Sequence, residues 1–187
     1  MELDRKKIEG LTGEYGGEYG LNHTRRLLHI ISWIGGGLEY DRDVLWTAAY
    51  LHDWGGYPRW IQSGTDHAVR SRGIAKEFLE NEGCETNFIE HVCECIEFHH
   101  GSSHSRSLES QLLSDADAID FTGTIGVLRE FSTRPRELRK AFEGIRSRVE
   151  KNRAILCLDK SKEIFESRSR RLQRVLAEFE EDAFGYY

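Results

Sequence analysis

Apolar residues recur at helical spacing along most of this chain, and that periodicity limits the folds it can adopt. One stripe runs from Leu27 through Ile30 and Ile34 to Leu38, and a second starts at Leu45. No alternation of apolar and polar residues is long enough to indicate a β-strand. Helices that each bury one stripe must pack against one another, so we predict an all-α, single-domain helical bundle.

The length of 187 residues suits one domain with a sizeable core, because two halves would each be small. We therefore predict a single domain over residues 1–187, with C-terminal helices over 134–183 packed on the rest. Glycine is frequent in the opening segment, at Gly10, Gly13, Gly16, Gly17 and Gly20. Because glycine weakens helices, we predict a loose lead-in there and ordered structure from Asn22 onward.

Charge and composition argue against several classes of partner. The net charge is −6, yet Lys and Arg outnumber Asp and Glu over residues 129–174. Charges of both signs alternate there, which is typical of a solvated face, so nucleic acid is not an expected partner. No apolar run reaches the length of a membrane span, and no signal-peptide pattern follows Met1. The four cysteines lack a paired zinc spacing and suggest reduced thiols in the cytoplasm.

His52 and Asp53 close the second stripe, and after Trp54 comes a glycine pair, Gly55 and Gly56, that predicts a left-handed helix end. Taken alone, this is typical of a buried histidine hydrogen-bonded to its neighbour. Further polar residues lie on or beside apolar stripes: His23, His67, His99 and Asp117. Several inward imidazoles and carboxylates need partners, and one divalent cation can satisfy them together. Mixed nitrogen and oxygen ligands suit Mn, Fe, Co, Ni or Zn better than Mg.

The ordered series His23, His52, Asp53 and Asp117 resembles the H…HD…D signature of the HD-domain superfamily of metal-dependent phosphohydrolases. Segments around the signature are also similar to small stand-alone prokaryotic HD hydrolases: Asn22 to Leu27, His67 to Ser71 and Leu113 to Asp120. The resemblance covers roughly residues 20–131. It implies an all-α fold of the HD type.

The resemblance also implies roles for individual residues. One metal would be held at the signature positions: His23, His52, Asp53 and Asp117. His67 and His99 match positions that bind a second metal or contact phosphate in binuclear relatives. Asp115 and Asp120 are expected to hydrogen-bond to the ligands or to neighbouring groups. No matching role exists for the remaining histidines, which we expect at the surface or behind the ligands: His29, His91, His100 and His104.

The chain departs from the family pattern HD-x-G-K/R at Gly56, which stands where a Lys or Arg often follows. A phosphate-facing charge would then come from elsewhere, and the candidates are Arg26, Arg59 and Arg70. Arg70 is favoured because it shares a helical face with His67. For Arg26, a surface ion pair is an equal alternative.

These features predict a metal-dependent phosphohydrolase that acts on a nucleotide or another small phosphate ester. The metal would activate water for attack on phosphorus. Asp53 would bind the metal and accept a hydrogen bond from that water, while His67 or His99 would protonate the leaving oxygen or stabilise charge.

Two other functions stay open. One is an HD-type di-iron oxygenase, because the six inward histidines and aspartates are compatible with two irons. The other is a non-enzymatic binding or regulatory module with a structural metal, whose contact surface would be the basic segment after Arg129. A homodimer is also left open.

Overall fold

The computed structural model describes residues 3–101 and 105–187. Over these residues the chain forms α-helices and one short 3-10 turn and contains no β-strand, which confirms the all-α prediction. The elements are α1 (Arg5–Ile34), α2 (Arg42–Leu51), η1 (Trp54–Gly56), α3 (His67–Asn81), α4 (Thr86–Glu97), α5 (Leu108–Asp120), α6 (Thr124–Thr133), α7 (Leu138–Ile155) and α8 (Asp159–Ala183). None of the described helices is both long and apolar enough to span a bilayer.

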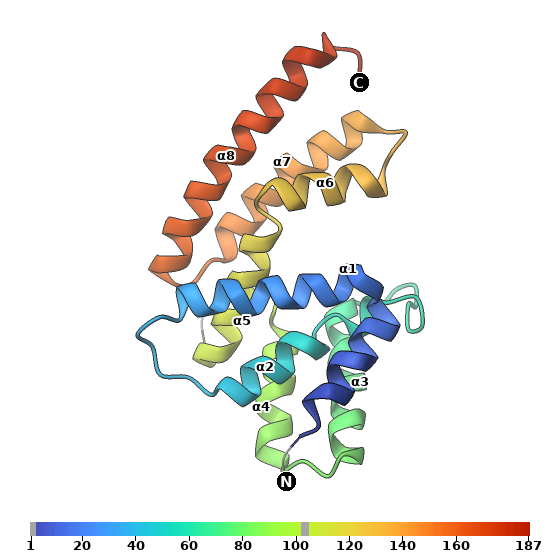
Figure 1. Ribbon diagram of the computed structural model, residues 1–187, viewed down its shortest axis with the longest axis vertical. Coiled ribbons are helices and arrows are strands. Elements are labelled where there is room, and N and C mark those ends of the chain that lie inside the picture. Colours follow the sequence, from blue (N-terminus) through green and yellow to red (C-terminus); the bar gives the residue numbers. More distant parts are fainter. Residues whose placement is uncertain (1–2, 102–104) are drawn as a thin grey trace.

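The helices form two groups along the long axis of the molecule (Figure 1). Helices α2, α3 and α4 lie on the side of α1 that holds the N-terminus, whereas α6, α7 and α8 lie on the side that holds the C-terminus. Helix α5 contacts α1, α2 and α4 as well as α7 and α8, so it joins the two groups. Every residue from Leu112 to Asp120 is buried, which places the acidic residues of α5 at the centre of the molecule.

The stripes predicted from the sequence form the core. Leu27 and Ile30 of α1 and Leu45 and Ala48 of α2 are all buried. Burial of a Leu or Ile side chain contributes about 1.5–3 kcal/mol, so these faces hold α1 and α2 against each other and against α5. Leu38 differs from the prediction: it is exposed, because α1 has already ended.

The prediction of a loose lead-in before Asn22 is wrong, because α1 starts at Arg5. The side chain of Asp4 caps this helix by accepting a hydrogen bond from the backbone N–H of Lys7 at 3.0 Å. The helix is broken only at Gly17, whose φ of 61° is a left-handed value that glycine adopts readily. One glycine therefore kinks the segment, and the others do not unfold it.

Two of the other glycines make room for the ring of Tyr57. A Cβ at Gly16 would lie 2.5 Å from Cζ of Tyr57, and a Cβ at Gly20 would also be closer to this ring than van der Waals contact allows. Nearby, Nε1 of Trp54 donates to Oγ1 of Thr12 at 2.9 Å. These contacts anchor the first half of α1 on η1 and the loop after it. Tertiary packing thus outweighs the low helix propensity of glycine.

Replacing Gly16 by alanine is expected to lower the free energy of unfolding by about 1–3 kcal/mol, because the new methyl group must displace the ring of Tyr57. The same change at Gly10, where an added Cβ meets no atom within 4 Å, is the matched control. It is expected to raise stability by up to about 1 kcal/mol. Urea unfolding measures both variants, and equal stabilities would contradict the packing argument.

Candidate metal centre

His52 and Asp53 stand where α2 ends. The turn that follows, Trp54–Gly56, is a 3-10 turn in which no glycine has a positive φ, so the predicted left-handed helix end is wrong. Gly55 is required for a different reason. A Cβ at this position would collide with the backbone nitrogen of Ser71, and the N–H of Gly55 donates to Oγ of Ser71 at 2.9 Å. Close packing of η1 on α3 therefore fixes where the His-Asp pair lies.

The four residues predicted to bind one metal converge from three parts of the chain. His23 comes from α1, His52 and Asp53 from the end of α2, and Asp117 from α5. Nε2 of His23 lies 3.1 Å from Oδ1 of Asp117 and 3.8 Å from Oδ2 of Asp53. Nε2 of His52 lies 3.5 Å from the same oxygen of Asp53. Nitrogen and oxygen atoms this close together can share one ion.

The hydrogen bonds of these residues leave their inner atoms available to an ion. Among the described residues, none forms a hydrogen bond with Nε2 of His23, Nε2 of His52 or Oδ1 of Asp117, although all three atoms are buried. The outer nitrogens are held: Nδ1 of His23 bonds to Oδ2 of Asp120 and Nδ1 of His52 to the carbonyl oxygen of Ala49, both at 2.8 Å. Such bonds direct the Nε2 lone pair at a metal. Because buried unpartnered atoms are unfavourable, the donor set fits a divalent transition metal.

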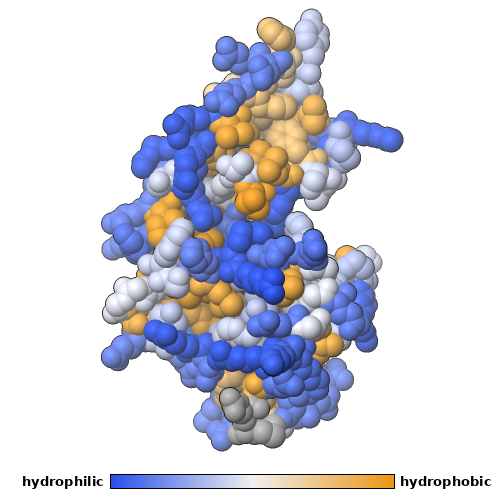
Figure 2. All heavy atoms as spheres, viewed as in Figure 1, coloured by the Kyte–Doolittle hydropathy of each residue, from blue (hydrophilic) through white to orange (hydrophobic). Residues whose placement is uncertain are grey.

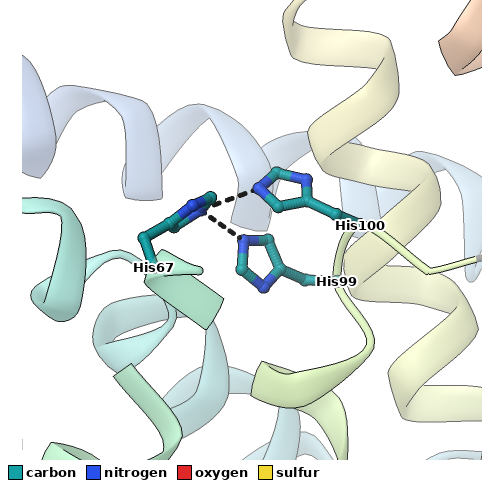
Figure 3. A group of neighbouring side chains, drawn as sticks. All are labelled: His67, His99 and His100. Atoms are coloured by element: carbon teal, nitrogen blue, oxygen red, sulfur yellow. Dashed lines mark hydrogen bonds between the residues drawn. The ribbon is translucent and has the colours of Figure 1, made fainter. Parts of the chain in front are cut away.

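A second group of imidazoles adjoins the first (Figure 3). The ring of His67, at the start of α3, faces the rings of His99 and His100, which follow α4. Nε2 of His67 lies 3.2 Å from Nε2 of His99 and 2.8 Å from Nε2 of His100. Asp53 connects the two groups, since its other oxygen, Oδ1, lies 3.5 Å from Nε2 of His67. The three imidazoles can hold a second ion.

His100 is a site residue that the sequence reasoning missed. Helix α4 ends at Glu97, so His99 and His100 lie in the turn beyond it and are not in helical register. Successive residues of a turn can face the same space, and here both rings face Nε2 of His67. Nδ1 of His100 also lies 3.5 Å from Oδ2 of Asp117, so this residue touches both groups. The adjacent pair of histidines is the signal that could have found it.

Carboxylates dominate the electrostatics around His23. Burial alone would lower its pKa, but the adjacent carboxylate of Asp117, the hydrogen bond to Asp120 and the charge of Asp53 together outweigh burial and raise the pKa of His23 to about 9. At His99, burial and the neighbouring imidazoles hold the pKa well below 6.5. A proton on His23 therefore balances part of the carboxylate charge, and a bound cation would take over that balance.

A cavity of about 700 Å³ opens on both groups of ligands. Asp53, His67, His100 and Asp117 line one side of it. The opposite side, which we call the basic wall, comes from α6 and α7 and carries Arg129, Arg134, Arg148 and Lys151. Figure 2 shows the surface hollowed between the two groups of helices, with hydrophilic side chains around the hollow. Part of the basic segment thus faces a cavity suited to a small anionic molecule, where a solvated face was predicted.

The three arginines predicted to bind phosphate lie outside the lining of this cavity. Arg26 donates two hydrogen bonds to Asp120, at 2.8 and 2.9 Å, and because Asp120 is buried this is not the surface ion pair weighed as its alternative. Arg70 donates to backbone oxygens of η1 and of the loop before α3. The guanidinium of Arg59 lies 5.0 Å from the ring centroid of Tyr15. These groups support the site and the loop beside it.

Of the remaining predicted residues, the two aspartates hydrogen-bond to neighbouring groups, and the described histidines lie away from the cavity. Asp120 bonds to His23, one of the predicted metal ligands. Asp115 accepts hydrogen bonds from two backbone N–H groups before α8, each at 2.9 Å, and so ties α5 to α8. His29 is exposed, and His91 pairs with a glutamate of α5 at 3.1 Å, away from the cavity. His104 lies outside the described residues.

The family model described as HD domain matches residues 20–122. Among curated proteins, none matches the chain. Among solved structures, the chain is similar to a predicted HD superfamily hydrolase from an uncultured Thermotogales bacterium, with 24% identity, coverage of 94% of this chain and 92% of that one, and a TM-score of 0.66.

Two other solved structures have similar scores. Bacillus subtilis YpgQ in complex with ADP is 20% identical, with 96% and 98% of the two chains covered and a TM-score of 0.73. An HD-superfamily hydrolase from Bacillus thuringiensis is 18% identical, with 96% of each chain covered and a TM-score of 0.70. At these identities the solved structures show a shared fold that extends over almost the whole chain.

Proposed function

This chain belongs to the HD-domain family, and from that membership we propose that it is a metal-dependent phosphohydrolase acting on a nucleotide or another small phosphate ester. One observation carries the proposal: Nε2 of His23, Nε2 of His52 and Oδ1 of Asp117 are buried and unpartnered beside a cavity with a basic wall. Hydrolysis is further supported by the HD superfamily hydrolases among the similar structures, and a nucleotide by the ADP in YpgQ.

HD domains bind divalent metals, and two groups of residues are available for them here. One metal would be held by the signature residues: His23, His52, Asp53 and Asp117. A second would be held, with Asp53, by the neighbouring histidines: His67, His99 and His100. The chemistry that such ions supply is Lewis acidity, which polarises a phosphoryl oxygen and acidifies water.

The side chains at the cavity surface have distinct tasks in this proposal. Asp53, whose side chain is 23% exposed, accepts a hydrogen bond from the attacking water and orients it. With only the first metal bound, His67, which is 30% exposed, would donate a proton from Nε2 to the leaving oxygen; with a second metal bound, the same nitrogen would be a ligand. His99 is fully buried, so it acts from behind the site and does not touch the substrate.

Arg129 would supply the positive charge that the chain lacks at Gly56. A Cβ at Gly56 would lie 3.8 Å from the side chain of His67, so a longer residue there would begin beside that imidazole. Arg129 reaches the same cavity from α6, with Nη1 3.5 Å from Oδ2 of Asp120. A guanidinium beside the ligand group can bind the oxygens of a phosphoryl group and stabilise their developing charge.

Metal removal tests the proposal. Elemental analysis of the purified protein is expected to find one or two equivalents of a divalent transition metal. Dialysis against a chelator should reduce hydrolysis of nucleoside mono-, di- and triphosphates to background, and adding back the metal should restore it. Thermal unfolding should show a lower midpoint without metal, because the ion binds only the folded chain. An unchanged rate in metal-free, folded protein would overturn the proposal.

The two ligand groups also fit a di-iron oxygenase, because Asp53 touches both of them. Iron close to two equivalents per chain, with turnover that requires oxygen, would favour that function over hydrolysis. Bound metal without either kind of turnover would favour a binding or regulatory module whose metal is structural.

A further inference from the structure

Two guanidinium groups of the basic wall share one aromatic ring. Cζ of Arg129 lies 4.2 Å from the ring centroid of Phe121, and Cζ of Arg148 lies 5.0 Å from the same centroid. Phe121 directly follows α5, and all three residues line the cavity. Two positive charges held this close repel each other, and the repulsion is relieved when an anion binds between them.

The positive charge of Arg129 is only partly neutralised by the residues around it. The carboxylate of Asp120 lies 3.5 Å from Nη1 of Arg129, but it already bonds at 2.8–2.9 Å to His23 and Arg26. None of the remaining contacts of Arg129 is with a carboxylate: Nε donates to the hydroxyl of Tyr19, the guanidinium lies over that ring, and Nη1 lies 3.4 Å from Nδ1 of His23. Its side chain is only 11% exposed, so this charge is held in place and poorly solvated.

Arg148 is held by a buried carboxylate on the neighbouring helix. Glu130 of α6 is 5% exposed and lies 2.9 Å from Nη2 of Arg148 and 2.7 Å from Nη1 of Arg134. Gly144 allows α7 to approach this closely, because a Cβ there would lie 2.9 Å from Oε1 of Glu130. One carboxylate therefore positions two guanidiniums and leaves the pair with a net positive charge.

Lys151 extends the wall by one further charge. It lies three residues after Arg148, which places both on the same face of α7. Lys151 is exposed, and it forms no ion pair with any residue that the structure describes. The wall as a whole carries four cations, of which Arg134 and Arg148 pair with Glu130, and Arg129 pairs with Asp120 at 3.5 Å.

We propose that the basic wall is a binding subsite for a second phosphate group, so that the preferred substrates carry one phosphoryl group at the metal ligands and another at Arg148 and Lys151. Arginine forks bind phosphate through paired hydrogen bonds, and Arg148, which Glu130 already positions, loses less conformational freedom on binding than an unpaired side chain. The substrate class is thus that of diphosphates. The inference rests on the proposed function for the first phosphoryl group, but the wall can be tested by binding alone.

The subsite would be contributed by α6 and α7, which lie beyond the segment that matches the HD family, residues 20–122. The family segment would then carry the metal ligands, and the C-terminal helices would select the substrate. Selection of this kind predicts that mutations in the wall change the preference between ligands and leave metal content unaltered.

The test compares two ligands that differ only by the second phosphate position, AMP and the uncleavable α,β-methylene ADP. Isothermal titration of the metal-loaded protein is expected to show tighter binding of the methylene analogue. In Arg148→Gln and in Lys151→Gln, its affinity should fall about tenfold, as for the loss of a charge-assisted hydrogen bond, while that of AMP changes less than twofold. Arg146→Gln, on an exposed face of the same helix, is the matched control and should change neither affinity.

Equal losses for both ligands, or no loss for either, in Lys151→Gln would overturn the subsite. That side chain is exposed and unpaired among the described residues, so the variant tests the wall even if Arg148→Gln folds poorly. Selective loss of the analogue in a protein that hydrolyses no phosphate ester would support the subsite and reject the proposed function. Hydrolysis of phosphate esters without a selective loss of affinity for the methylene analogue would support the proposed function and reject the subsite.

Discussion

Replacing Asp53 by alanine is expected to abolish hydrolysis and to release bound metal. Asp53 lies between the two ligand groups: Oδ2 is 3.5 Å from Nε2 of His52, and Oδ1 is 3.5 Å from Nε2 of His67. The substitution therefore removes a ligand from both groups as well as the acceptor that orients water. Loss of such a principal group typically lowers kcat on the order of 10³-fold or more. Steady-state kinetics and elemental analysis measure the two effects.

Asp43→Ala is the matched control for this variant. Asp43 is an exposed aspartate in the first turn of α2, where it pairs with Arg5, and it lies outside the cavity. Metal content and rate should stay at wild-type values in Asp43→Ala. Wild-type protein should also gain thermal stability when metal is added, and Asp53→Ala should gain little. If Asp53→Ala kept both its metal and its rate, the proposed centre would be ruled out.

The Asp120→Ala variant is expected to be weaker in both stability and metal binding. The carboxylate of Asp120 is buried and accepts hydrogen bonds from Nδ1 of His23 and from Arg26. Its removal leaves a buried imidazole and a partly buried guanidinium without a partner, which lowers the free energy of unfolding by about 3–5 kcal/mol. Loss of a residue that orients a ligand lowers metal affinity by about 10–100-fold. Urea unfolding in chelator and competition with a metal-binding dye measure the two quantities.

Two further variants separate the tasks of this carboxylate. Asp120→Asn keeps an oxygen that can accept from His23, so it should retain more metal affinity than Asp120→Ala. Arg26→Gln removes the ion pair and leaves His23 bonded, so it should lower stability with little change in metal affinity. If Arg26→Gln instead raised KM for phosphate esters at unchanged stability, Arg26 would be a phosphate ligand, and the supporting role given to it here would be wrong.

The sequence predicted the site only as far as helical spacing and residue type could identify its members. Helical spacing located the stripes of α1 and α2, and residue type identified imidazoles and carboxylates that lie beside them. Those rules marked His23, His52, Asp53 and Asp117 as polar residues on or beside apolar stripes, and the family resemblance implied that they bind one metal. His100 was missed because the family resemblance gave it no role, although it directly follows His99 and lies with it in the turn after α4.

Arginines and glycines were the least predictable residues, because their roles depend on partners far away in the sequence. Arg70 is close to His67 in the sequence, yet it donates hydrogen bonds to backbone oxygens of η1 and the loop before α3. Arg129 is far from the ligand residues in the sequence, yet it faces the cavity. In the same way, Gly16 is helical because the ring of Tyr57 packs on it. The two residues of such a pair are too far apart in the sequence to fall within one short segment, so a local pattern cannot reveal the contact between them.

The sequence by itself determined the helical class and the chemical types of the ligands, because hydrophobic periodicity and side-chain chemistry are properties of short segments. Only the tertiary structure decided how those ligands divide into two groups joined by Asp53, and that a basic wall faces them. The wall depends on α6 and α7 packing across the end of α5, where Phe121 and Glu130 meet Arg148. Contacts of that kind are fixed by the three-dimensional path of the chain, which brings together residues that no local pattern connects.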